Sequence, residues 1–180
     1  MNRTHLVSSL AWIWIGLCVL SCEDRCSCPA PTPVCGDDWQ PVAYPAPTYG
    51  RISVSQGVSG DVWYWEGNFM PWCPTGTVRA VSRELRVYEQ ATDGDVTWTP
   101  HAGHSFIESV RTPLVATAHS DSTGFFQLSL PAGDYSMFSV EDSLLFGGDR
   151  EDLDGHLSPI DVGPGEVVQF RFDIDYKKAM

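Results

Sequence analysis

The stretch from Asp121 to Phe138, DSTGFFQLSLPAGDYSMF, contains two alternating apolar and polar runs joined by a short turn. Before the first run, Asp121-Ser122-Thr123-Gly124 predicts another turn, because glycine accepts a positive φ at little cost. Proline and glycine in Pro131-Ala132-Gly133 are typical of a chain reversal between the runs. The alternation predicts one buried face, made of Phe126, Leu128, Leu130, Tyr135 and Met137. We therefore expect a β-hairpin whose residues have mechanical tasks and no chemical ones.

The rest of the chain repeats the period of two. VVQFRFDIDY near the C-terminus predicts a half-buried strand, whose inner face is made of Val168, Phe170, Phe172, Ile174 and Tyr176. ELRVYEQ predicts a second strand, with Leu85 and Val87 opposite Glu84, Arg86 and Tyr88. GDVWYWEG and PLVATAHS are also β-rich, whereas HSFIESVRT has room for a turn or two of helix at most. The sequence thus predicts an all-β domain over residues 51–180, an antiparallel Greek-key β-sandwich of about seven strands.

A family resemblance rests on the first of these stretches. The pattern Asp-x-x-Gly-x-Phe-x-x-x-Leu-Pro-x-Gly-x-Tyr, from Asp121 to Tyr135, resembles the carboxypeptidase regulatory-like family. VSRELRVYE and LSPIDVGPGEVVQFRFDIDYKKA are similar to its early and closing strands, so the resemblance covers most of Gly57 to Ala179. It implies a transthyretin-like (prealbumin-like) fold, as in bacterial lipoproteins that carry one such domain without an assigned activity. The motif has no catalytic residues to carry over.

The N-terminus indicates export. Arg3 is followed by an uncharged apolar run from Leu6 to Leu20, which is shorter than the roughly 20 residues that a membrane-spanning helix needs. Residues 1–21 are therefore expected to be a signal peptide. Val19 to Cys22, VLSC, resembles the lipobox of bacterial lipoproteins, although Leu20 departs from that pattern and Cys18 is a rival cysteine. Cys22 is the expected lipidation site; the alternative is an ordinary signal peptide whose cysteine enters a disulfide.

Residues 22–50 are rich in proline and show no apolar period, which predicts an extended tether that holds the domain off a membrane. After a cut before Cys22 the formal charge is about 10 − 23 = −13, because Arg3 is the only charged residue upstream. Such a charge disfavours a nucleic-acid partner and repels anionic lipid surfaces. The acidic pair after Cys22 is similar to lipoprotein sorting signals. We expect the bacterial cell envelope, with the outer membrane or cell surface favoured over the inner membrane.

The cysteines agree with an oxidising compartment. Four of them follow Cys22, namely Cys26, Cys28, Cys35 and Cys73. Because a bond across one residue would be strained, Cys26 or Cys28 is expected to join Cys35, and another of them to reach Cys73. Three pairings remain open. A structural zinc site is the weaker alternative, since the stretch lacks two Cys-x-x-Cys hooks or nearby histidines.

Candidate chemistry is sparse, and no catalytic residue, cofactor or metal ligand is expected. Asp149 to Asp161, DREDLDGHLSPID, gathers carboxylates beside Gly155, which makes calcium binding an alternative function. On a calcium-loop alignment Asp152 and Asp154 take the third and fifth positions, but Arg150 falls at the first. A solvated acidic turn is the favoured interpretation. His101 and His104 are expected to lie in a loop, and there is no Gly-x-Ser-x-Gly elbow.

Tryptophan is the one suggestive excess, with seven in the chain. Trp63 and Trp65 share a strand face, while Trp72 and Trp98 lie elsewhere. Exposed rings stack on sugars, so a carbohydrate-binding module is the first alternative function; rings that fill the sandwich core are the favoured interpretation. The sequence as a whole predicts a lipid-anchored, non-catalytic structural or interaction module. Its expected partners are the membrane, through Cys22, and an envelope protein or glycan.

Overall fold

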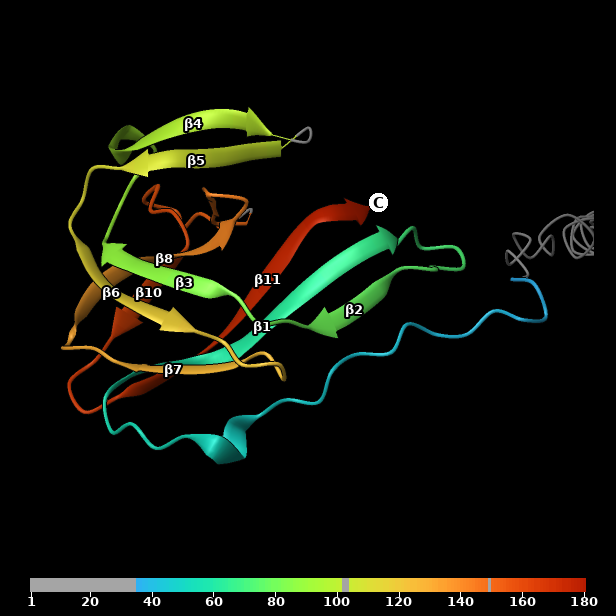
Figure 1. The fold of residues 1–180 in the computed structure, drawn as a ribbon, viewed down its shortest axis with the longest axis horizontal. Helices are drawn as coiled ribbons and strands as arrows, with labels where there is room; N and C mark the ends of the chain where they lie inside the picture. The colour runs from blue at the N-terminus through green and yellow to red at the C-terminus, as the bar shows by residue number, and fades with distance from the viewer. Residues whose placement is uncertain (1–34, 102–103, 149) are drawn as a thin grey trace, which may run out of the picture. The chain divides into compact units, whose positions relative to one another are not determined.

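The computed structural model describes residues 35–101, 104–148 and 150–180, and there it contains eleven strands and two short 3-10 helices. The strands form two sheets and no barrel, which confirms the expected all-β sandwich (Figure 1). The count exceeds the expected seven or so, because several short strands carry no recognisable alternation in the sequence. Cys22, Cys26, Cys28 and the signal-like residues 1–21 lie outside the described residues.

The four-stranded sheet is organised by one long strand, β1 (Gly57–Asn68). One edge of β1 pairs in parallel with β11 (Val167–Ala179). Its other edge pairs antiparallel with two strands in succession, β7 (Phe125–Ser129) and β2 (Thr77–Ala80). The parallel pair departs from the expected antiparallel arrangement. No tight turn connects β1 to β11, so the connection does not dictate their relative direction.

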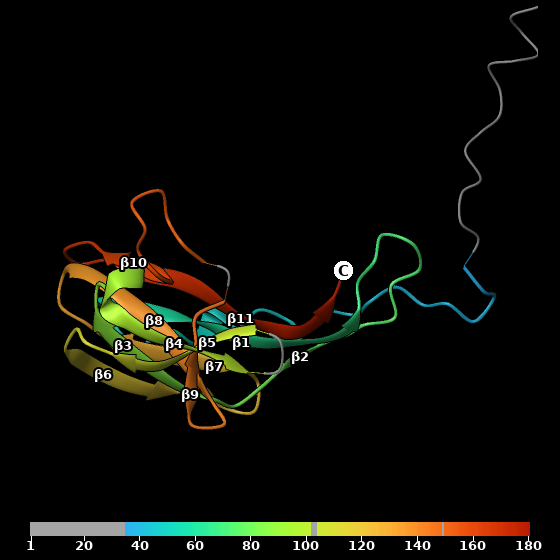
Figure 2. The same ribbon diagram turned by 90° about the horizontal axis from the view of Figure 1, so that it is seen from above.

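The seven-stranded sheet has the order β4 (Val96–His101), β5 (His104–Val110), β9 (Leu144–Phe146), β8 (Gly133–Glu141), β3 (Glu84–Glu89) and β6 (Leu114–His119). The short β10 (Pro159–Val162) also pairs with β8. The two 3-10 turns are η1 (Tyr49–Arg51), before β1, and η2 (Asp93–Asp95), before β4. Figure 2 shows the two sheets from above.

The predicted hairpin at Asp121–Phe138 is wrong in one respect, since β7 and β8 belong to different sheets and do not pair with each other. The local chemistry is as expected: Asp121 Oδ1 accepts the backbone N–H of Thr123 at 2.8 Å, and Gly124 has φ +81°. A Cβ on Gly124 would lie 2.7 Å from the carbonyl oxygen of Val62, so the turn also needs the close approach that glycine permits. The Pro131-Ala132-Gly133 turn therefore carries the chain from one sheet to the other.

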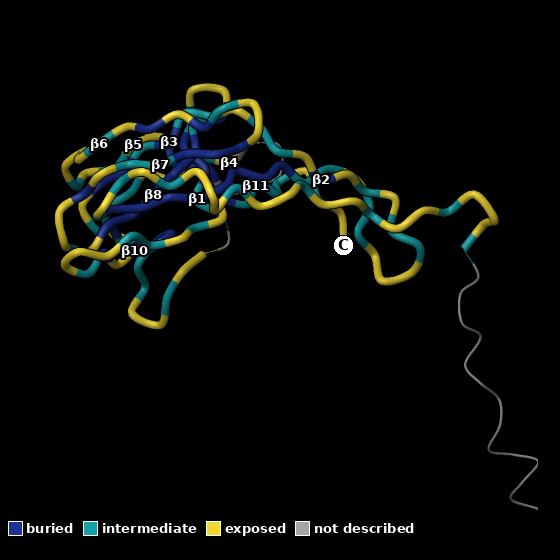
Figure 3. Tube along the Cα trace, turned by 90° about the horizontal axis from the view of Figure 1, so that it is seen from below, coloured by how far each residue is buried: buried dark blue, intermediate teal, exposed yellow. Residues whose placement is uncertain are grey.

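The main core lies between the sheets, and the inner-face predictions for β3, β7, β8 and β11 are confirmed. Figure 3 shows the buried parts of the chain in dark blue. The members of this cluster come from both sheets and include Val58, Val62, Tyr64, Leu85, Val87, Phe106, Phe126, Leu130, Tyr135, Met137, Phe146, Ile160, Val162, Phe172 and Ile174. The contacts among these apolar side chains remove both inner faces from water, which holds the two sheets together.

A second apolar cluster covers the other face of the seven-stranded sheet. It consists of Tyr88, Ile107, Phe138, Leu145 and Leu157. The stretch HSFIESVRT, which had room for a turn or two of helix at most, forms the strand β5 instead. This strand places Phe106 in the main core and the next residue, Ile107, in the second cluster. A strand alternates its side chains between two faces, and here both faces are buried.

The outer face of the four-stranded sheet is covered by the N-terminal segment, Trp39–Gln56, which belongs to the same compact unit as the sandwich. Thr48 donates its hydroxyl to Asp61 at 2.5 Å, and Asp61 is only 3% exposed. Arg51 donates to Asp121 at 2.6 Å and lies over the ring of Phe125 at 4.3 Å. Residues 39–50, which composition assigned to the tether, are therefore held by specific side-chain contacts.

Candidate functional site

The acidic loop, Arg150–Ser158, connects the β9 region to β10 and is organised by Asp152. Its Oδ1 accepts the backbone N–H groups of Asp154 and His156, each at 2.9 Å. Its Oδ2 lies 2.8 Å from Nδ1 of the His156 ring. Gly155 makes the reversal possible with φ +85°. One carboxylate therefore closes the loop with three hydrogen bonds.

These contacts also set the charge of the loop. The backbone N–H of His156, followed by its ring, holds the pKa of Asp152 below its usual value, because both stabilise the carboxylate form. Asp152, Asp154 and His156 can each offer a ligand atom, and these atoms lie within 4.8 Å of one another. Two carboxylates and an imidazole can chelate a divalent cation. The hydrogen bonds of Asp152, however, already account for its position in the loop.

Of the residues in the predicted calcium loop, the structure brings Asp152 and Asp154 together and leaves others outside the cluster. Arg150, at the first position, turns away from the cluster: it donates to the carbonyl of Arg171 at 3.1 Å and lies 4.4 Å from the Phe170 ring. Asp161 lies in β10 and is exposed, and Asp149 is outside the described residues. Calcium binding stays a prediction, and a rise in melting temperature at millimolar calcium is its measurement.

Sequence reasoning missed His156 as a member of this cluster. The signal was present as Asp152-x-Asp154-x-His156, a spacing of two that is easily read as part of an acidic run. A turn that returns on itself was needed to bring the third residue back to the first.

Two shallow grooves share Arg150 and Glu151 among their lining residues. One, of about 260 Å³, is lined by Asp93, Trp98, Gly148, Arg150, Glu151 and Leu157. Trp98 is 41% exposed, and its indole N–H donates to Asp93 at 2.6 Å, which fixes the ring orientation. The other, of about 280 Å³, is lined by Arg150, Glu151, Asp152, Pro159 and Phe170. An exposed indole beside carboxylates and a guanidinium has the groups that stack on a sugar ring and bind its hydroxyls.

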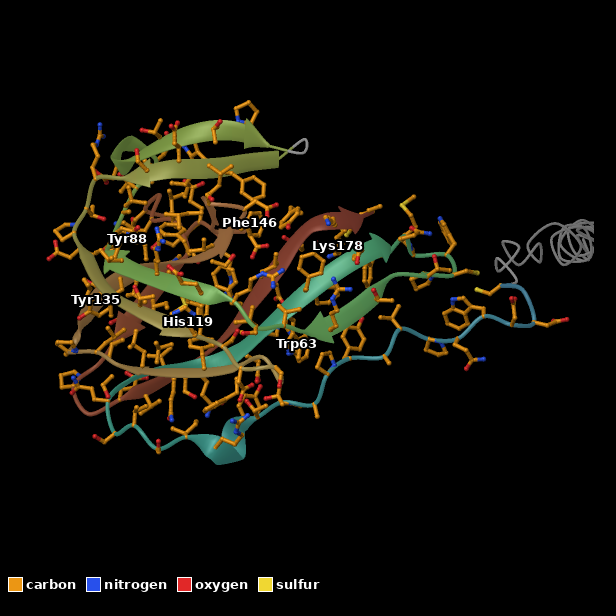
Figure 4. The ribbon with its side chains drawn as sticks, viewed as in Figure 1. Trp63, Tyr88, His119, Tyr135, Phe146 and Lys178 are labelled. Carbon is orange, nitrogen blue, oxygen red and sulfur yellow. The ribbon has the colours of Figure 1, made fainter. Side chains whose placement is uncertain are left out.

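Trp63 is buried and Trp65 partly buried, but neither belongs to the core between the sheets, so the favoured interpretation is wrong about their location. Both lie on the outer face of β1, where Tyr44 from the N-terminal segment contacts them, with ring centroids 6.3 and 5.7 Å away. Trp63 is 7% exposed and Arg171 lies 4.9 Å from its ring, so it offers no open stacking platform (Figure 4). Trp65 is partly buried and donates to Asp173 at 2.9 Å.

A buried polar cluster that the sequence did not indicate is formed by Glu141 with Arg83 and Tyr176. Glu141, 5% exposed, accepts from Arg83 at 2.8 Å and from the Tyr176 hydroxyl at 3.1 Å. Burial, together with the hydrogen bond to Tyr64 and the charge of Glu141, raises the pKa of Tyr176. The cluster joins β8 and β11, one strand from each sheet, to Arg83, which directly precedes β3, and its paired charges suit a structural task.

The histidine and cysteine predictions have mixed outcomes. The expected loop position of His101 and His104 is wrong, because they are the last residue of β4 and the first of β5 and are opposite one another in the register. Cys35 and Cys73 are disulfide-bonded, which confirms the use of disulfides, and the expected pairing of Cys35 with Cys26 or Cys28 is wrong.

In the described parts of the chain, no helix is long and apolar enough to cross a bilayer.

Comparison of the chain with models of known families, with curated proteins and with solved structures found no match. The fold class and the surfaces described above therefore stand on the chain's own residues.

Proposed function

We propose that this chain is an exported, lipid-anchored module of the bacterial cell envelope, with a non-catalytic β-sandwich of the carboxypeptidase regulatory-like type. The observation that supports it best is the use made of the motif residues. Asp121 accepts a hydrogen bond that closes a turn, and Gly124 lets the backbone pass close to the Val62 carbonyl. The Tyr135 hydroxyl donates to the Pro131 carbonyl at 3.1 Å. Each motif residue thus has an architectural partner, which leaves recognition to the loops and sheet edges.

The anchor is testable at one residue. Cys22, next to the small Ser21, is the proposed acceptor of the lipid. The mass of the N-terminal peptide from membrane-extracted protein should include a diacylglyceryl group on Cys22. A Cys22→Ala variant should leave the membrane fraction, because one sulfur carries the acyl chains. If that variant fractionates with membranes as the parent does, the proposed anchor is wrong.

A glycan is the second candidate partner, and the groove at Trp98 favours it. The exposed ring is oriented by Asp93, while Arg150 and Glu151 line the same groove. On a glycan array, Trp98→Ala should lose the signal of the parent, and Tyr49→Ala, at a 55% exposed ring outside this groove, should retain it. A blank array for the parent would remove the glycan and leave a protein partner.

A further inference from the structure

The connection between β1 and β2, the tip loop Phe69–Thr75, is unusually apolar for an exposed turn. Its sequence is FMPWCPT, in which Met70 is 40% and Trp72 is 60% exposed. Phe69 turns back and packs on Trp65, with ring centroids 5.2 Å apart. Figures 1 and 2 both show this loop beyond the end of the seven-stranded sheet, where β1, β2 and β11 continue alone. The loop that carries the exposed Trp72 and Met70 therefore extends beyond the part of the domain where the two sheets pack together.

Cationic groups gather at the base of this loop. The chain has a formal charge of −12 and only two lysines, Lys177 and Lys178, which are opposite Glu66 and Gly67 in the β1–β11 register. The Lys178 ammonium lies 5.1 Å from the Trp65 ring and 5.8 Å from the Phe69 ring. The Lys177 ammonium lies 5.8 Å from the Tyr64 ring. Ammonium groups beside aromatic rings suit a boundary between apolar and aqueous phases (Figure 4 labels Lys178).

The upstream chain leaves the domain at the same loop. The indole N–H of Trp39 donates to the carbonyl of Pro74, within the tip loop, at 2.9 Å. Cys22 is 39 − 22 = 17 residues before Trp39, a length that spans at most about 60 Å when fully extended. A lipid on Cys22 would therefore tether the domain by its tip-loop end.

We propose that the tip loop docks on the phospholipid bilayer that holds the anchor, with Trp72 and Met70 at the boundary between headgroups and acyl chains. Lys177 and Lys178 then contact lipid phosphates. The docking rests on the proposed function for its membrane. The acidic remainder of the chain does not prevent it, because charges farther than a Debye length of about 8 Å are largely screened at physiological salt. Tethering keeps the loop close to the surface, so a modest interfacial affinity suffices.

The test uses the mature lipidated protein in vesicles of phosphatidylethanolamine and phosphatidylglycerol, 7:3, with bromines near the headgroup end of the acyl chains. Bromine quenches tryptophan only in contact, so the parent should lose fluorescence relative to unbrominated vesicles. Trp72→Phe should abolish most of that loss. Trp98→Phe, its control at an exposed indole on β4, should retain it. Equal quenching in the parent and Trp72→Phe, or no quenching in the parent, would overturn the proposal.

A second arm separates the docking from the anchor. A Cys22→Ser chain, beginning at residue 22 and carrying an N-terminal hexahistidine, is bound to the same vesicles through nickel-chelating lipid. Quenching that depends on Trp72 should persist there, and Lys177→Gln with Lys178→Gln should reduce it. If this arm quenches while the cellular protein carries no lipid on Cys22, the anchor fails and the docking stands. If Cys22 carries lipid and neither arm shows quenching, the docking proposal is wrong and the anchor proposal stands.

Discussion

The two sheets have their outer faces covered in different ways. On the seven-stranded sheet the cover is apolar, with Ile107 and Leu157 packed on Tyr88 and Phe138. On the four-stranded sheet the cover is the N-terminal segment, held by hydrogen bonds from Thr48 and Arg51 and by the Tyr44 ring. Apolar packing stabilises in proportion to buried area, whereas each of the few polar contacts contributes about 0.5–3 kcal/mol, with the upper end for bonds to charged groups. The first cover should therefore belong to the cooperative unit, and the second should open locally.

The largest expected effect is at Phe138, which is fully buried in the second cluster. Phe138→Ala should lower the free energy of unfolding by about 3–5 kcal/mol, because it removes a buried ring and leaves a cavity. Denaturant unfolding is the measurement, with Phe126→Ala in the main core as the matched variant. A loss below about 1 kcal/mol at Phe138 alone would show that the second cluster is only a loose cover.

Thr48 probes the polar cover. Thr48→Ala removes the hydroxyl donor to the buried Asp61 carboxylate and should cost about 1.5–3 kcal/mol, the range for hydrogen bonds to charged groups. Amide exchange in residues 48–54 should accelerate while exchange in β8 stays unchanged. Thr48→Ser keeps the hydroxyl and should resemble the parent. If Thr48→Ala instead accelerates exchange throughout the sandwich, the N-terminal segment is part of the cooperative unit.

Substitution of Tyr44 tests the aromatic contacts of the N-terminal segment, with a smaller expected loss of stability than at Thr48. Its ring is 57% exposed, so Tyr44→Ala should cost only about 0.5–1.5 kcal/mol, as for other aromatic pairs. Trp63, 7% exposed beneath it, should become accessible to acrylamide. Stern–Volmer quenching of the folded protein measures this, and Tyr49→Ala is the control. Unchanged quenching would mean that Arg171 and the backbone alone shield the indole.

The smallest effect concerns pH. Hydrogen bonds from Thr123 and then Arg51 lower the pKa of Asp121 from 3.8 to about 2. Because the folded pKa is below the unfolded one, the contribution is complete above about pH 4 and is lost as the pH falls toward 2. Solvent screening at this exposed pair keeps it below about 1 kcal/mol. Arg51→Gln should raise the Asp121 pKa in a carboxyl-carbon NMR titration; an unchanged pKa would assign the whole shift to Thr123.

The sequence by itself determined which face of β3, β7, β8 and β11 is buried in the main core. Alternation in VVQFRFDIDY and in FFQLSL marks the inner residues, since a strand exposes its two faces in turn and only one meets the core. The turn at Asp121 and Gly124 could also be predicted, because its hydrogen bond and its positive φ depend only on neighbouring residues.

Only the tertiary structure decided which strands pair. Alternation is the same whether β8 returns beside β7 or crosses to the opposite sheet, so the expected hairpin was wrong. It also decided the position of Trp63, whose neighbour Tyr44 is 19 residues away in a proline-rich stretch without period. Partners brought together by long-range packing leave no local pattern, and the candidate surfaces of this protein are made of such partners.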